Sequence, residues 1–202
     1  RSVKEIEERL FTQLALDYRQ MQTLLSQNPS LAQNLSVFSL SATPEEMLSY
    51  LSKAMQTDFP DLDNPKYEVK YVPESMEEFS SPAFYLTPPA DTLSPNTIYI
   101  NRSSQVNPAE LFTTLAHEGF PGHLYQTLYY GNQNPAPIRN LLGCSGYIEG
   151  WATYVESISY GYAASYFKVE PELLQLLWQN RSISLCLYSL LDIKIHEYGW
   201  TL

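Results

Sequence analysis

The sequence lacks any apolar run long enough to cross a membrane, since spanning a bilayer takes about 20 apolar residues and no stretch approaches that length. Basic residues are also scarce: 12 Lys and Arg stand against 22 Asp and Glu, for a net charge of -10. Such a chain repels a polyphosphate backbone and has no cluster of Lys and Arg to offset this locally. We therefore expect no membrane span in this chain and no nucleic-acid partner.

Cysteine is rarer still, with Cys144 and Cys186 as the two examples. Neither has a second Cys or a His at the spacing of a zinc finger, which argues against that class of site. We expect both thiols to be reduced and buried, as small apolar side chains usually are.

The size and composition favour one folded unit. A length of 202 residues fits a single compact domain, and an apolar fraction of 44% argues against disorder. We expect one catalytic region over 1–202. Because the chain opens on Arg1 and not on Met, we also expect it to be a fragment of a longer protein, with the missing N-terminal part as a partner. Its location stays open, with secretion or the cell surface as candidates.

The first part of the chain, 1–57, has a helical pattern. Apolar residues recur every three to four positions up to Leu25, which predicts an amphipathic helix that ends near Asn28. Thr43, followed by Pro44 and two acids, predicts the start of a second helix. The apolar stripe of the first helix consists of Val3, Ile6, Leu10, Leu14, Tyr18, Met21 and Leu25.

The segment 58–106 is rich in proline, which excludes long helices, while its runs YEVKYV and TIYIN favour extended chain. We expect two or three short strands there. The segment 107–202 is helical again, with helix starts at Asn107 and near Pro171 and a helical stretch from about Ile138 to Tyr162. The stripe of the last helix is predicted as Leu173, Leu177, Ile183, Leu187, Leu191 and Ile195. The fold class is therefore mainly α with a small β-sheet insert.

Two of the three histidines in the chain lie in one run, HEGFPGH, from His117 to His123. Many zinc peptidases carry His-Glu-x-x-His on a helix, because residues four apart face one ion. Six positions instead turn the second imidazole about 120° from the first on a straight helix. Pro121 and Gly122 are suited to deform it, since Pro lacks an N–H and Gly tolerates unusual dihedrals. We predict a bulged or broken turn between Glu118 and His123.

An alternative for this run involves no metal: the Pro-Gly pair simply ends one helix, and His123 starts another. The scarcity of histidine argues against it, because two of three histidines would then lie beside a glutamate without a shared purpose.

A third protein ligand would leave a fourth position open, and Glu149 is the candidate. It lies 26 residues after His123 in a separate helical segment, where Gly146 and Gly150 would allow helices to approach closely. Glu156 follows two turns later and points the same way, so that one carboxylate ligates while the other orients an imidazole. Alternatively, both are solvated surface acids.

Asp192 and His196 are four residues apart on the last helix, close enough to hydrogen-bond. Such a histidine can stabilise an oxyanion, although a structural role, bonding a buried carbonyl, is the alternative. Tyr198 and Arg181 are weaker candidates of the same type.

These motifs together, HEGFPGH, EGWATYVE and the late DIKIHEYGWT, resemble the bacterial family called domain of unknown function 885, which is similar to the gluzincin zinc peptidases. The resemblance implies a largely helical fold with a small sheet, a Zn²⁺ ion and hydrolysis of peptide bonds. It implies His117, His123 and Glu149 as ligands, Glu118 as general base, and His196 in the wall of the active site.

We therefore expect zinc-dependent cleavage of a peptide substrate by a metal-activated water, with Glu118 as the base and a hydrogen bond from His196 or Tyr198. The strand Thr97 to Asn101 is expected to align the peptide by edge pairing. One alternative is an esterase or small-amide hydrolase that uses the same metal. Another is a non-catalytic, zinc-containing module that binds peptides, although Glu118 would have no use beside a closed structural site.

Overall fold

The computed structural model describes residues 1–36, 38, 42–103, 106–140 and 142–201. Its contacts divide the chain into two compact units. Unit 1 comprises Arg1–Val37 and Val169–Leu202, and unit 2 comprises Phe38–Lys168. One catalytic region over 1–202 stays a prediction.

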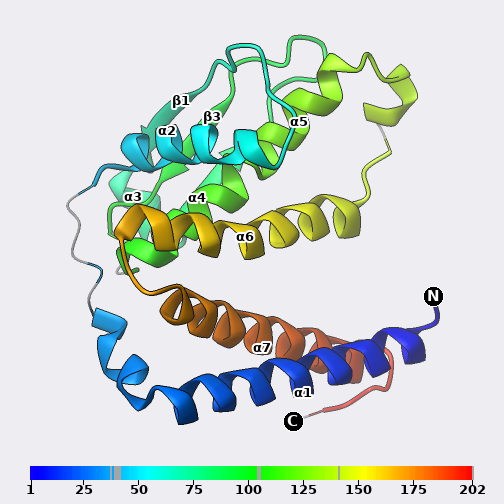
Figure 1. The fold of residues 1–202 in the computed structure, drawn as a ribbon. Helices are drawn as coiled ribbons and strands as arrows, with labels where there is room; N and C mark the ends of the chain where they lie inside the picture. Colours follow the sequence, from blue (N-terminus) through cyan, green and yellow to red (C-terminus); the bar gives the residue numbers. More distant parts are fainter. Residues whose placement is uncertain (37, 39–41, 104–105, 141, 202) are drawn as a thin grey trace. The chain divides into compact units, whose positions relative to one another are not determined.

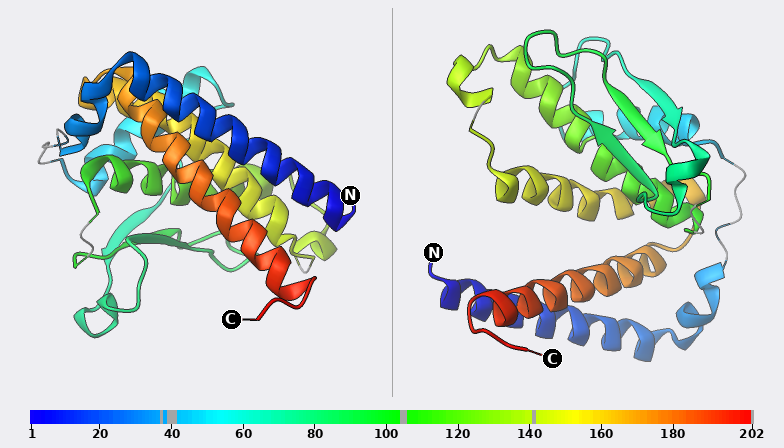
Figure 2. Two further views of the ribbon diagram at one scale, coloured as in Figure 1. Left: turned by 90° about the horizontal axis from the view of Figure 1, so that it is seen from below. Right: turned by 180° about the vertical axis from the view of Figure 1, so that it is seen from behind.

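Unit 1 is a hairpin of two long helices, α1 (Val3–Gln27) and α7 (Pro171–His196), with the 3-10 helix η1 (Pro29–Ser36) after α1 (Figure 1). Both long helices begin where the sequence predicts. Figure 2 shows the two helices side by side. They are antiparallel, because the start of α1 meets the end of α7: Glu7 pairs with Lys194, and Asp17 bonds Ser182.

The hairpin has a polar contact in its interior that the apolar stripes did not predict. Asp17 is 3% exposed and accepts hydrogen bonds from Ser182 Oγ at 2.6 Å and from Gln13 Nε2 at 2.8 Å. A buried carboxylate is tolerated when its oxygens are bonded in this way. The predicted stripe was wrong at five positions that are 42–52% exposed: Ile6, Tyr18, Leu187, Leu191 and Ile195.

Unit 2 is built around three helices that contact one another: α2 (Pro44–Ala54), α4 (Pro108–Glu118) and α6 (Ser145–Phe167). Two of them start at the predicted caps. The Thr43 side chain accepts from the Glu46 N–H, and the Asn107 side chain accepts from the Glu110 N–H. The fully buried core of the unit includes Leu48, Leu51, Ile98, Phe112, Leu115, Leu124 and Val155.

The proline-rich segment forms three short strands, as predicted: β1 (Glu68–Tyr71), β2 (Ala83–Leu86) and β3 (Thr97–Ile100). The sheet order is β1-β3-β2, with β1 parallel and β2 antiparallel to β3. β3 is therefore the central strand, and the expectation that it pairs with a peptide at an edge was wrong. The backbone groups of β3 are already shared by two neighbours, whereas β2, which contacts α4, is an edge strand.

Shorter elements complete unit 2: the 3-10 helices η2 (Met55–Thr57) and η3 (Pro137–Asn140), and the helices α3 (Glu74–Glu77) and α5 (His123–Asn132). The chain is thus mainly helical with a small sheet, which confirms the predicted fold class. Within the described parts of the chain, no helix is long and apolar enough to cross a membrane.

Both cysteines are free thiols. Cys186 is buried, as expected, but Cys144 is exposed. The expectation of a buried Cys144 was wrong because the chain around it, 142–150, is exposed throughout.

Candidate metal centre

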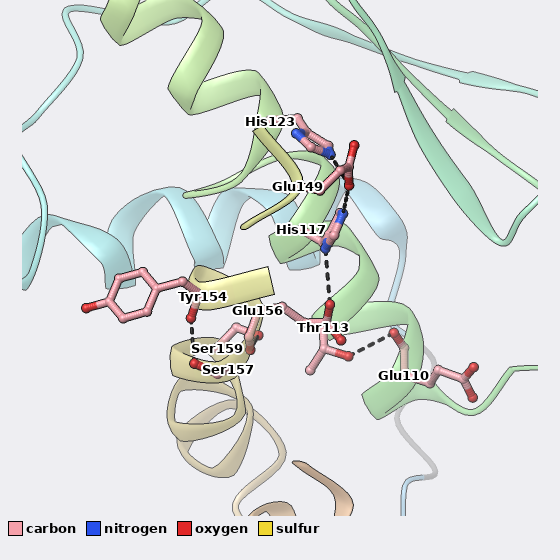
Figure 3. A network of polar contacts seen from close by, with 9 residues as sticks. All are labelled: Glu110, Thr113, His117, His123, Glu149, Tyr154, Glu156, Ser157 and Ser159. Atoms are coloured by element: carbon pink, nitrogen blue, oxygen red, sulfur yellow. Dashed lines mark hydrogen bonds and ion pairs between the residues drawn. The ribbon is translucent and has the colours of Figure 1, made fainter. Parts of the chain in front are cut away.

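Two histidines meet where α4 ends and α5 begins. His117 is the last residue but one of α4, and His123 is the first residue of α5. Their ring centroids lie 4.8 Å apart, with the ring planes at 86°. The side chains are 16% and 13% exposed, so that both imidazoles are largely enclosed and face a common position (Figure 3).

The link between the two helices, residues 119–122, stands where a straight helix would have continued its turn. The backbone leaves the helical region at Gly119 (φ -108°, ψ -99°) and enters α5 from Gly122 (φ -79°, ψ -134°). The predicted break between Glu118 and His123 is confirmed. The break is more complete than a bulge, since α4 ends at Glu118 and α5 begins at His123. This agrees with the alternative in which the Pro-Gly pair ends one helix and His123 starts another. The two histidines nevertheless lie side by side.

The link depends on glycine, because its backbone packs against the end of α4. A Cβ built on Gly122 would lie 1.8 Å from the carbonyl oxygen of His117 and 2.4 Å from that of Ala116. A Cβ on Gly119 would lie 2.5 Å from Leu48 Cδ2. Glycine at these positions therefore allows the chain to return close enough to bring His123 back beside His117.

Glu149, on α6, reaches both imidazoles. Its Oε2 lies 3.5 Å from Nε2 of His117 and 3.6 Å from Nε2 of His123 (Figure 3). One ligand atom from each of these three residues lies within 4.8 Å of the others. The Glu149 side chain is 62% exposed, so the cluster has two enclosed nitrogens and one oxygen that faces solvent.

Glu156 approaches the same histidine from the other side. Its Oε2 lies 3.1 Å from Nδ1 of His117, and its side chain is 5% exposed. The prediction that Glu149 and Glu156 point the same way is confirmed, since both contact His117. The alternative of two surface acids was wrong for Glu156, which is buried.

The close helix approach expected at Gly146 and Gly150 was wrong. A Cβ built at either position meets no heavy atom of the described residues within 4 Å. Both glycines lie in the exposed first turns of α6, so α6 brings Glu149 to the histidines without a glycine contact.

The pKa values of the two histidines shift in opposite directions. Burial alone would lower the pKa of His117, but the hydrogen bond with Glu156 and the charges of Glu118, Glu156 and Glu149 outweigh it and raise that pKa. For His123, burial and the neighbouring charge of His117 together lower the pKa, although Glu149 opposes them. His123 therefore favours the neutral form, which is the form that binds a metal.

Glu118 is held by the edge strand. Its Oε2 accepts a hydrogen bond of 2.9 Å from the backbone N–H of Tyr85, on β2. Burial raises the pKa of Glu118, while this N–H and the charge of His117 lower it, and the net direction is upward. The result is an oriented carboxylate with raised proton affinity directly after a candidate metal ligand.

Over residues 2–202, the chain matches the family described as "Bacterial protein of unknown function (DUF885)". The chain belongs to the DUF885 family. No curated protein matches it.

Among solved structures, this DUF885 chain is similar to the crystal structure of "the putative lipoprotein from Colwellia psychrerythraea", with a TM-score of 0.77 and 23% sequence identity. The match covers 100% of this chain and 38% of that one. The DUF885 chain therefore spans well under half the length of that protein, and the likeness shows a shared fold.

Four candidate site residues of the DUF885 chain belong to unit 1 and not to the unit that carries the histidine cluster. His196 Nε2 lies 3.5 Å from Asp192 Oδ1, and both side chains are exposed. The Tyr198 hydroxyl donates to Glu7 Oε2 at 3.2 Å, and this bond raises the pKa of the phenol. Roles for these residues and for Arg181, on α7, in the metal centre stay predictions.

Sequence reasoning missed two contacts at this centre. One is the Tyr85 N–H, a backbone group that no sequence motif identifies. The other is the indole of Trp151, whose Nε1 donates to the carbonyl of Pro121 at 3.0 Å. The sequence does place Trp151 two residues after Glu149, and this is the one signal that could have drawn attention to it.

Proposed function

We propose that this DUF885 chain binds Zn²⁺ through His117, His123 and Glu149 and hydrolyses peptide bonds, with Glu118 as general base. The observation that supports it most is the position of Glu149 Oε2, 3.5 Å and 3.6 Å from the Nε2 atoms of the two histidines.

The two distances from Glu149 Oε2 fit a shared cation. Protein atoms that bind zinc tetrahedrally at about 2.0 to 2.2 Å lie about 3.3 to 3.6 Å from one another. A direct hydrogen bond between imidazole and carboxylate would be shorter, at about 2.7 to 3.2 Å. Two imidazoles and one glutamate are also a donor set of catalytic zinc sites, which keep a fourth position open.

Zinc held by these three residues would supply Lewis-acid chemistry, since it would polarise a carbonyl oxygen and lower the pKa of a bound water to about 7. The protein contributes a base beside it. Glu118, oriented by the Tyr85 N–H, accepts the proton of the attacking water and passes it to the leaving amine. Its raised pKa suits this role, because a base works best when its pKa lies near the working pH.

The motifs around these residues give further support. HEGFPGH and EGWATYVE resemble motifs of the DUF885 family, which is similar to the gluzincin zinc peptidases, and both lie within the segment that matches that family.

The decisive test is Glu118→Gln in the purified protein. Glutamine keeps the size of the side chain but cannot take up the proton. We expect zinc content to stay at one ion per chain by elemental analysis, while cleavage of a mixed peptide library falls about 10²- to 10⁴-fold. Glu78→Gln, at an exposed glutamate in the same unit, is the matched control and should leave both quantities unchanged.

The same assay separates the alternatives. Cleavage of ester or small-amide substrates but not of peptides would identify a different hydrolase. Stoichiometric zinc without any turnover would indicate a binding module, and unchanged peptide turnover in Glu118→Gln would remove Glu118 as the base.

A further inference from the structure

The link between the two histidines is buried along its whole length. All four residues of Gly119–Gly122 are buried, so the backbone groups of this non-helical segment have little access to water. Buried carbonyl groups need hydrogen-bond partners within the protein. Two of them bond to the following helix: Gly119 O accepts from the Tyr125 N–H at 3.2 Å, and Gly122 O accepts from the Gln126 N–H at 2.9 Å.

A third carbonyl of the link bonds to a side chain. The carbonyl of Pro121 accepts a 3.0 Å hydrogen bond from the indole Nε1 of Trp151. Pro121 stands between His117 and His123, and Trp151 stands on α6, two residues after Glu149. This one contact therefore joins the helix that carries the carboxylate to the link that spaces the two imidazoles.

The indole is fixed in orientation by aromatic neighbours. Its ring lies edge-on to Phe59, with centroids 5.8 Å apart at 76°, and stacks on Tyr125 at 6.5 Å and 14°. A ring held on two sides directs its single N–H in one direction, and that direction is the link.

We infer that Trp151 is a positioning residue for the metal centre: its indole N–H fixes the Pro121 carbonyl and so sets the spacing of His117 and His123. The inference rests on the zinc-binding part of the proposed function and is independent of peptide hydrolysis. Groups that orient ligands from outside the first coordination sphere typically change metal affinity about 10- to 100-fold when removed.

Trp151→Phe tests this, because phenylalanine keeps an aromatic ring between Phe59 and Tyr125 but has no N–H. In competition with a chelator, we expect the variant to bind zinc about 10- to 100-fold more weakly than the wild type. The visible absorption spectrum of the Co²⁺-loaded protein should change as well, because it reports ligand geometry. Circular dichroism and the thermal midpoint establish that the variant is folded.

Tyr125→Phe is the matched control. It keeps the ring that stacks on Trp151 and the backbone N–H that bonds Gly119, and it removes a hydrogen bond from an aromatic side chain to a backbone carbonyl outside the link, that of Pro60. A role in packing alone predicts similar effects for both variants. The positioning role predicts that Tyr125→Phe keeps the zinc affinity and the Co²⁺ spectrum of the wild type.

A second substitution guards against a folding defect in Trp151→Phe. Replacing Trp151 with 3-benzothienylalanine keeps the bicyclic shape and exchanges the N–H for sulfur, and it should weaken zinc binding to the same extent. Wild-type affinity and an unchanged Co²⁺ spectrum in this variant would overturn the inference while leaving the proposed function intact. A wild-type protein that binds neither ion would overturn both.

Discussion

The carboxylate of Glu156 lies 3.1 Å from Nδ1 of His117, on the far side of the ring from Glu149. An ionised carboxylate accepts hydrogen bonds and cannot donate them, so in the neutral imidazole this contact favours the tautomer with its proton on Nδ1. The lone pair of Nε2 is then directed at the position shared with His123 and Glu149. Glu156 thus selects the tautomer of His117 that can bind a metal.

The two glutamates should therefore differ in their effect on zinc. Glu149→Ala removes a proposed ligand and is expected to abolish stoichiometric zinc in elemental analysis. Glu156→Gln keeps an acceptor but loses the charge, so we expect zinc to remain bound about 10- to 100-fold more weakly in chelator competition. Full zinc content in Glu149→Ala together with its loss in Glu156→Gln would exchange the two roles.

Gly122→Ala should disrupt the centre, because a Cβ there would lie 1.8 Å from the carbonyl oxygen of His117. The link has to move away from α4, and His123 moves with it. We expect loss of stoichiometric zinc and a lower thermal midpoint. Gly146→Ala, where a Cβ meets no described heavy atom within 4 Å, is the control. It should bind zinc normally and keep the thermal midpoint of the wild type, because the added methyl group meets no described heavy atom.

Tyr85→Pro should shift the pH dependence of activity. The backbone N–H of Tyr85 lowers the pKa of Glu118 against the raising effect of burial. Removing this N–H therefore raises the pKa further. A base must be deprotonated to act, so the acidic limb of the kcat/KM profile should move to higher pH.

An edge strand tolerates proline where the N–H faces away from the sheet, as it does at Tyr85 on β2. Tyr85→Ala is the matched control, since it loses the same side chain and keeps the N–H. Superimposable pH profiles for the two variants would show that the Tyr85 N–H does not tune Glu118.

Asp17→Ala should destabilise the helical hairpin. It leaves the hydroxyl of Ser182 without its buried acceptor, which typically costs about 1 to 3 kcal/mol. Urea unfolding followed by circular dichroism measures this loss. Asp192→Ala, at an exposed position on α7, should stay within about 0.5 kcal/mol of the wild type. Equal stability of both variants would mean that the buried contact contributes nothing.

Helix starts and the break in the run HEGFPGH could be predicted because they depend on near neighbours in the sequence. Asn107 caps α4 through a residue three positions away. Pro121 and Gly122 interrupt the helix wherever the rest of the chain lies, because one lacks an N–H and the other lacks a side chain.

Local sequence patterns did not predict correctly which side chains are buried or how the strands are ordered, because these depend on tertiary packing. A stripe that recurs every three to four residues fixes the buried face of a helix only to within about one position, and the structure buries Asp17 where the sequence predicted Tyr18. The order of the strands in the sheet could not be predicted either. The composition of each short strand in 58–106 suits the edge of a sheet as well as its centre.

The sequence by itself therefore determined the fold class, the two histidines with their adjacent glutamate, and the break that lets them converge. Only the tertiary structure decided that the Tyr85 N–H holds Glu118, and that Glu156 is the one of the two glutamates that bonds Nδ1 of His117. The Tyr85 N–H is 33 positions from Glu118, and Glu156 is 39 positions from His117. Contacts over such separations arise from the packing of strand and helices on one core, and no local pattern of residue types specifies them.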